Sequence, residues 1–245
     1  MESKINRYSK QLILINSFFI LAWLVVSVFP FIWTFWGSFK VKADFFSRAD
    51  WMFAVTGVNT LIETGDTSTV KAYVESWTEG EFWKATMNTI IITVSVVTIS
   101  LFLGTLGAYA LSRSTYKYTF WILIAALIFR AMPHITLVSG YLFPFFQLNV
   151  WGILPTTIIV LVAINQPFSL WLLYSFFKTV PKELDESALI DGCSYFQAFR
   201  FVIMPVMWPG VVTAGLFSMM LAYNDFTVTS LLLNQQNYTM VPKIN

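Results

Sequence analysis

The chain has 245 residues, of which 57% are apolar and only 11% are charged. Soluble domains carry about 25% charged residues, and a soluble protein this apolar would expose large hydrophobic patches and aggregate. The net charge of +2 gives no reason to expect a nucleic acid partner. A single cysteine excludes a disulfide within the chain, and a single histidine argues against a zinc site.

Five apolar stretches are long enough to cross the hydrocarbon layer as helices, which takes roughly 20 residues each. Backbone groups in lipid must be hydrogen-bonded within the chain, and no stretch shows the alternation of a strand. We therefore predict an all-α integral membrane protein, a polytopic helical bundle. The predicted spans are residues 12–36, 87–111, 120–146, 152–177 and 206–233. The first is too long for the apolar core of a signal peptide, so we expect it to be retained.

Lysine and arginine residues predict the orientation of these spans. Three cations precede the first span, and Arg113 and Lys117 lie between the second and third. An excess of such cations marks the cytoplasmic side of a membrane protein. The resulting topology has a cytoplasmic N-terminus (1–11), an external loop (37–86), a permease-like core (87–233) with a cytoplasmic loop (178–205), and an external tail (234–245).

The cytoplasmic loop is the most informative segment. It begins with acidic residues, which the positive N-terminal end of a helix favours: Glu183, Asp185 and Glu186. Gly192 follows, and glycine tolerates the left-handed conformation that ends helices. Helical periodicity then resumes over residues 195–203. We predict a helix, a break and a second helix, held at both ends by spans. This shape suits a rigid lever against a cytoplasmic partner.

The loop reads Pro-Lys-Glu-Leu-Asp-Glu-Ser-Ala at 181–188 and Asp-Gly-Cys at 191–193. It resembles the coupling loop of ABC importer permeases of the carbohydrate, maltose-type family, which has Pro-Lys-Glu-Leu-Glu-Glu-Ala-Ala, two residues, and Asp-Gly-Ala. Ser187 and Cys193 replace alanines of that pattern, and both are small enough to keep close packing.

The resemblance extends into the spans. Residues 129–133 resemble the family's Phe-Arg-x-x-Pro, and the Tyr-Asn-Asp-Phe sequence at 223–226 resembles its Trp-Asn-Glu-Phe. The implied fold is that of type I ABC importer permeases. That family usually has six spans, whereas five are visible here, so we expect the chain to be incomplete.

The resemblance implies a subunit of an ATP-driven, binding-protein-dependent importer in the inner membrane of a bacterial or archaeal cell. The chain would have no catalytic residue, metal or cofactor of its own. Its partners would be membrane lipid, a dimer of ABC ATPases that binds ATP and Mg, a second permease subunit and an extracytoplasmic solute-binding protein. No Gly-x-x-x-x-Gly-Lys-Ser/Thr phosphate loop occurs, so the ATPase must be a separate chain. The few charges in the spans favour a sugar-like solute; a polyol, a glycerol phosphate or another small solute is the alternative.

The resemblance assigns the coupling role to residues of the loop. Glu186 is expected to pair with a cation of the ATPase, and Ala188 and Gly192 to permit close approach. The alternative is that the loop acids are simply solvated charges. The candidate coupling residues are Glu183, Asp185, Glu186, Ser187, Ala188, Asp191, Gly192 and Cys193.

A second group of candidates, for the solute pathway, lies near the outer end of the fifth predicted span: Tyr223, Asn224 and Asp225. Ionisable residues within spans usually face a cavity and are functional candidates. The alternative is that Asp225 reaches water or caps a neighbouring helix, and that Asn224 ties its span to another. Arg130 lies within the third predicted span, and we expect it to pair with a carboxylate or with backbone carbonyls of the second permease subunit rather than to contact the solute.

Other residues within the spans predict packing and bends. Gly104 and Gly107 predict close helix packing near the inner end of the second span. Pro133 and Pro167 are hinges or static kinks, which the sequence does not separate.

Two other classes of membrane protein fit less well. A membrane-embedded enzyme would need a clustered catalytic set, such as two facing aspartates or several histidines. Asp225 is the only acidic residue well inside a predicted span, and the sequence has a single histidine. A proton-coupled secondary transporter would typically show internal repeats and intramembrane acid pairs. We find neither in the sequence.

Overall fold

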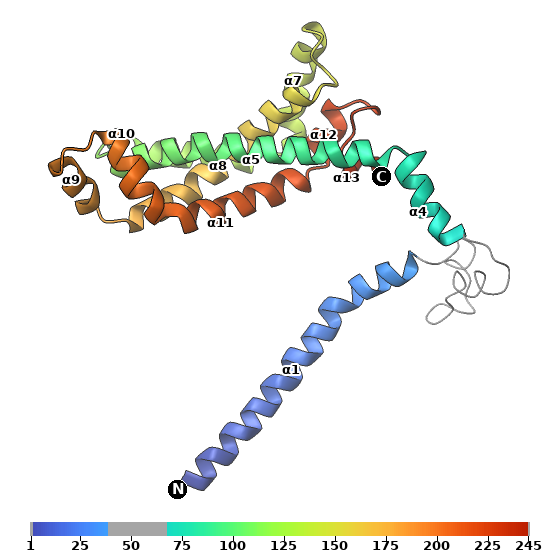
Figure 1. The fold of residues 1–245 in the computed structure, drawn as a ribbon, viewed down its shortest axis with the longest axis horizontal. Helices are drawn as coiled ribbons and strands as arrows, with labels where there is room; N and C mark the ends of the chain where they lie inside the picture. The colour runs from blue at the N-terminus through green and yellow to red at the C-terminus, as the bar shows by residue number, and fades with distance from the viewer. Residues whose placement is uncertain (1, 39–67, 245) are drawn as a thin grey trace. The chain divides into compact units, whose positions relative to one another are not determined.

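The structure is a computed structural model that describes residues 2–38 and 68–244 (Figure 1). The chain divides into two compact units, Met1–Gly80 and Glu81–Asn245, and each is described by itself. Most of the predicted external loop, 37–86, lies outside the described residues. Within the described part, the chain is helical apart from short connections.

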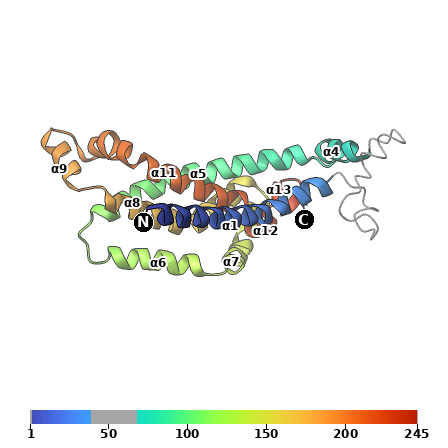
Figure 2. The ribbon, with the colours of Figure 1, turned by 90° about the horizontal axis from the view of Figure 1, so that it is seen from below.

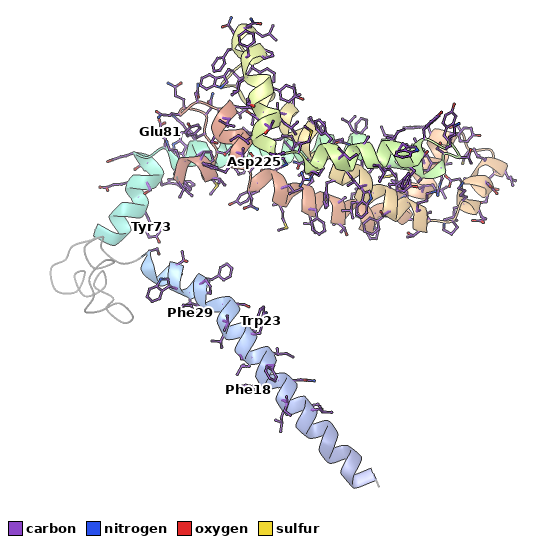
Figure 3. All side chains as sticks on the ribbon, turned by 180° about the vertical axis from the view of Figure 1, so that it is seen from behind. Phe18, Trp23, Phe29, Tyr73, Glu81 and Asp225 are labelled. Carbon is purple, nitrogen blue, oxygen red and sulfur yellow. The ribbon has the colours of Figure 1, made fainter. Side chains whose placement is uncertain are left out.

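The first unit contains helices α1 (Glu2–Gly37) and α4 (Ser68–Thr78). Within α1, Leu12–Phe35 is apolar and long enough to cross a membrane, as predicted for residues 12–36. Large apolar side chains such as those of Phe18, Trp23 and Phe29 are exposed on this helix (Figure 3). A helix that is apolar on all sides is suited to lipid contact.

The second unit is built around three long helices, α5 (Phe82–Arg113), α8 (Leu154–Thr179) and α11 (Met204–Tyr223), which lie side by side (Figure 1). Two clusters of buried apolar residues hold them together. One includes Val96, Leu161 and Ala222. The other includes Ala108 and Phe177 and lies toward the end where α9 and α10 project.

Glycines set how closely these three helices approach. A Cβ atom at Gly104 would lie 3.1 Å from Leu173 Cδ1, and one at Gly107 would lie 3.2 Å from Leu170 Cδ1. The close packing predicted at these two positions is therefore confirmed. At Gly210 the contact is tighter, because a Cβ atom would lie 2.9 Å from Cγ of the Phe176 ring.

The third predicted span, 120–146, is sharply bent at Pro133, one of the prolines expected to act as a hinge or a kink. The segment forms two helices, α6 (Thr119–Ala131) and α7 (His134–Gln147), at 86° to each other (Figure 2). Pro133 follows Met132, whose backbone is extended with ψ 141°. A proline ring disfavours helical geometry in the preceding residue and lacks the N–H that would continue the helix. Among the described residues, four helices are long and apolar enough to cross a membrane, or five if this bent pair counts as one span.

The last predicted span, 206–233, differs from the structure at both ends. Its helix begins earlier, with α10 (Tyr195–Gln197) and a π-helical segment η1 (Ala198–Ile203) running directly into α11. A capping box starts it, since Gln197 N donates to Ser194 Oγ and Ser194 N donates to Gln197 Oε1. It ends at Tyr223, and a separate short helix, α12 (Thr227–Leu232), follows.

The segment after α12 packs back on the bundle. Asn237 Nδ2 donates to the carbonyl of Gly152 over 2.7 Å, and Met240 N donates to Thr89 Oγ1 over 2.9 Å. The last helix, α13 (Met240–Ile244), lies against α5. Residues 234–244 therefore form part of the bundle, at the end opposite to α9 (Figure 1).

The contact at Gly210 predicts a loss of stability on substitution. Gly210→Val should lower the free energy of unfolding by about 1–3 kcal/mol, because the new side chain overlaps the Phe176 ring. Thermal unfolding of the detergent-purified chain measures this. Gly140→Ala is the matched control, since a Cβ atom at Gly140 in α7 would meet nothing within 4 Å. Equal stability of the two variants would contradict the proposed close packing of α8 and α11.

Candidate functional site

The loop at residues 178–205 has the predicted helix, break and second helix. Helix α9 (Glu183–Ile190) ends where Gly192 N donates to the carbonyl of Leu189 and Cys193 N donates to that of Ala188. Gly192 has φ +91°, the left-handed region in which glycine is unstrained. Helices α9 and α10 project from one end of the bundle, where they form its tip (Figure 1).

Most of the candidate coupling residues lie on the surface of this tip, and Cys193 is half-buried. A Cβ atom at Gly192 would meet nothing within 4 Å, so the space around it is open to a partner. Ala188, in contrast, is buried, and its small side chain serves packing within the chain. The exposed members of the set are Glu183, Glu186, Ser187, Asp191 and Gly192.

Three large apolar side chains are also exposed at this end, and sequence reasoning did not single them out. Ile190 is 85% exposed, Tyr195 is 76% exposed and Phe196 is 63% exposed. They flank the break at Gly192, and we call them the exposed tip. Tyr195 and Phe196 begin the apolar helical stretch Tyr195–Tyr223, which is long enough to cross a membrane, and Ile190 lies before it. The sequence did contain a signal for these exposed side chains. They are apolar residues beside a glycine that ends a helix, in a loop predicted to be cytoplasmic.

Asp185 differs from its acidic neighbours because it faces the bundle. Its Oδ2 lies 2.8 Å from Arg113 Nη2 at the end of α5, and the two side chains are 13% and 16% exposed. The phenol of Tyr109, one turn earlier in α5, donates to Asp185 Oδ1. Sequence reasoning used Arg113 only for orientation and did not assign Tyr109 a role, because the partners lie more than 70 residues apart.

The three candidate pathway residues are not brought together into one site. Asp225 Oδ1 accepts hydrogen bonds from the backbone N–H groups of Val228 (2.8 Å) and Thr229 (3.1 Å) at the start of α12. Burial raises the pKa of the Asp225 carboxyl above its ordinary value, and these two hydrogen bonds lower it. Asp225 thus caps a neighbouring helix, the alternative left open by the sequence, near the base of α7 (Figure 3). Asn224 Nδ2 donates to the carbonyl of Met220 in its own helix.

Tyr223 lines a cavity. This cavity has a volume of about 540 Å³ and lies between α5, α11 and the start of α13. Its walls are almost entirely apolar, although several of the residues that line it are polar: Thr86, Thr89, Thr93, Thr98 and Tyr223. The hydroxyls of Thr86, Thr89 and Thr98 donate to backbone carbonyls within α5.

Charged groups within the bundle are few. Arg130 Nη1 donates to the carbonyl of Ile164 over 3.4 Å, and its guanidinium lies 5.7 Å from the centre of the Phe168 ring. The backbone partner of Arg130 thus comes from its own chain, whereas we expected partners from the second permease subunit. In residues 2–38 and 68–244, no three side chains of histidine, cysteine, aspartate or glutamate are placed to hold a metal ion.

Comparisons with known proteins agree on one kind of molecule. Residues 97–245 match the family described as "Binding-protein-dependent transport system inner membrane component". The trehalose/maltose transport system permease of Thermococcus litoralis is 31% identical, over 95% of this chain and 79% of its own. A diacetylchitobiose uptake system permease of Streptomyces coelicolor is 28% identical, over 89% of this chain and 68% of its own.

The fold has a counterpart among solved structures. It matches a chain of a bacterial ABC transporter involved in the import of the acidic polysaccharide alginate. The TM-score is 0.73 with 21% identity, over 94% of this chain and 77% of that chain. The likeness shows that nearly the whole chain adopts a known fold.

The hydrogen bonds of Asp225 predict how substitutions there act. Asp225→Ala should destabilise α12 by about 0.5–2 kcal/mol, because it removes an acceptor from two N–H groups. Asp225→Asn keeps an acceptor oxygen and should retain most of that stability. Amide hydrogen exchange over residues 227–232 measures the difference. If both variants exchange like the wild type, the cap does not hold α12.

Proposed function

Because the chain belongs to the family of inner-membrane components of binding-protein-dependent transport systems, we propose that it forms half of the translocation pathway for a sugar or a sugar-like solute. As a member, it is a multi-pass membrane protein and the permease subunit of an ABC importer, a transport component and not an enzyme. The family match over residues 97–245 is the observation that carries this function.

The names of the relatives support a sugar as the solute. They describe uptake of diacetylchitobiose in one case and transport of trehalose and maltose in the other. These solutes share many hydroxyl groups and no net charge. The cavity that Tyr223 lines has no charged side chain in its walls, which suits an uncharged solute better than an ion.

The coupling role belongs to the loop at residues 178–205. We propose that its exposed tip docks on a separate ABC ATPase, which binds the ATP and Mg, and that Glu186 pairs with a cation of that subunit. Support comes from the exposure of Glu186, the open space around Gly192 and the three exposed apolar side chains. A surface with an apolar centre and a charged rim is typical of protein interfaces.

The remaining partners follow from the same proposal. A second permease subunit completes the pathway, and an extracytoplasmic solute-binding protein delivers the solute to the outer face. The cations before α1 and after α5 support a cytoplasmic N-terminus and a cytoplasmic position for the exposed tip.

Substitution in the loop tests the docking. The double variant Glu186→Gln with Gly192→Asp should lose the ATPase on co-purification from detergent-solubilised native membranes, since it removes one charge of the interface and adds another. Neither side chain packs within the chain, but aspartate at φ +91° strains the turn after α9. The single variant Glu186→Gln leaves this turn unchanged and should also weaken recovery of the ATPase. Lys117→Gln, an exposed change four residues after Arg113, is the control and should keep the ATPase. Full recovery of the ATPase with the double variant would contradict the docking.

Uptake measurements test the solute class. Cells that lack this chain should lose uptake of radiolabelled di- or oligosaccharides, tested with chitobiose, maltose and trehalose, and regain it with the wild-type chain. Uptake of glycerol 3-phosphate should be unchanged. Loss of glycerol 3-phosphate uptake with normal sugar uptake would overturn the assignment to sugars.

A further inference from the structure

One guanidinium group joins three segments at the cytoplasmic end of the bundle. Arg113 lies in the last turn of α5. Its Nη1 donates to the backbone carbonyls of Phe177 (3.2 Å) and Val180 (3.0 Å), at the end of α8. Its Nη2 lies 2.8 Å from Asp185 Oδ2 in the first turn of α9. The side chain thus connects α5, α8 and α9 directly.

Tyr109 makes a second connection between α5 and α9. Its hydroxyl donates to Oδ1 of Asp185, so both oxygens of this carboxylate are held from α5. Its ring packs against Phe177 of α8, with centroids 5.7 Å apart, and Phe199 of η1, with centroids 4.8 Å apart. The same residue therefore contacts both halves of the loop.

The charges of Arg113 and Asp185 each suit the helix end at which they lie. The last carbonyls of a helix have no partner within it, and a cation at that end is favoured by the helix dipole. Arg113 supplies this cation to α8, and Asp185 supplies an anion to the first turn of α9. When one member of a buried pair is removed, the other is left as an uncompensated charge. The two side chains consequently hold each other in place.

Apolar packing reinforces the connection on the same side of α9. Phe177, Val180 and Phe199 form one buried cluster with Ala108, and Leu184 of α9 packs against it. Glu186, the next residue after Asp185, is exposed. Helix α9 therefore has an inner side fixed to α5 and α8, and an outer side free for a partner.

We propose that Arg113 and Tyr109 are positioning residues that make α9 move as one body with α5 and α8, so that a force at the exposed tip is carried into the membrane along α5. The contacts of Asp185 with Arg113 and Tyr109 then form an inner anchor for α9, and we call these contacts the anchor. Asp185 does not belong to the surface that meets the ATPase. The anchor rests on the proposed function only for the source of the force. Its geometry is a property of this chain alone.

Hydrogen exchange of the purified chain tests the geometry without any partner. Amides of residues 183–190 should exchange slowly in the wild type and at least about tenfold faster in Arg113→Gln and in Asp185→Asn, because local opening then breaks fewer contacts. Tyr109→Phe should give a smaller increase, since it removes the hydroxyl and keeps the ring packing. Lys117→Gln is the control. Wild-type α9 exchanging as fast as in Arg113→Gln would overturn the anchor whatever binds the tip.

Transport per ATP hydrolysed tests the mechanical role. The complex that co-purifies with the chain is reconstituted in liposomes, and maltose or chitobiose uptake is compared with ATP hydrolysis. Asp185→Asn and Arg113→Gln should retain the ATPase but lower this ratio about tenfold, within the usual range of coupling between sites. The double variant should lose no more than either single variant, because both break the same contact.

The outcomes separate the anchor from the docking. An unchanged ratio in Asp185→Asn and Arg113→Gln, or losses that add in the double variant, would overturn the anchor. Loss of the ATPase from the Asp185→Asn complex would also overturn it, because Asp185 would then belong to the docking surface. Failure of the docking itself appears elsewhere, as retention of the ATPase by the Glu186→Gln, Gly192→Asp variant.

Discussion

Gly104 of α5 and Gly210 of α11 leave room for the side chains of Leu173 and Phe176 on α8, which a Cβ atom at either position would approach to about 3 Å. In lipid there is no water to expel from between helices, so such close contact is a main source of association between spans. The approach of α5, α8 and α11 fixes where their ends next to the loop at residues 178–205 lie. Everything built on those ends, including the loop and its exposed tip, depends on this packing.

The ends of α5 and α8 meet the loop through polar contacts. At the last turn of α5, Arg113 satisfies carbonyls at the end of α8 and pairs with Asp185 of α9. On the other side of the loop, η1 continues into α11 with no break in the helix. The loop is thus joined to the bundle at each of its two helices. A membrane subunit that receives force from a cytoplasmic partner needs this kind of connection, because a flexible loop would absorb the movement.

The sequence predicted the helical class, most of the spans and the helix break at Gly192, because hydropathy and glycine act locally. It identified Pro133 as a hinge or a kink but did not predict an angle of 86°, since the neighbouring helices decide how far a span bends at a proline. Asp185 and Glu186 look alike in sequence, and only the position of Arg113, more than 70 residues away, turns one inward and leaves the other exposed. The capping role of Asp225 also depends on a helix end, at Tyr223, that hydropathy did not reveal.

Cys193 gives direct access to the central claim, that the tip of the loop meets the ATPase. It is the one cysteine in the sequence, directly follows Gly192 and has a free thiol. A photoreactive maleimide attached to Cys193 in native membranes should, on illumination, join this chain to an ABC ATPase, and the adduct should be identified by mass spectrometry. Complete labelling of Cys193 with adducts only to lipid or to other proteins would contradict the account.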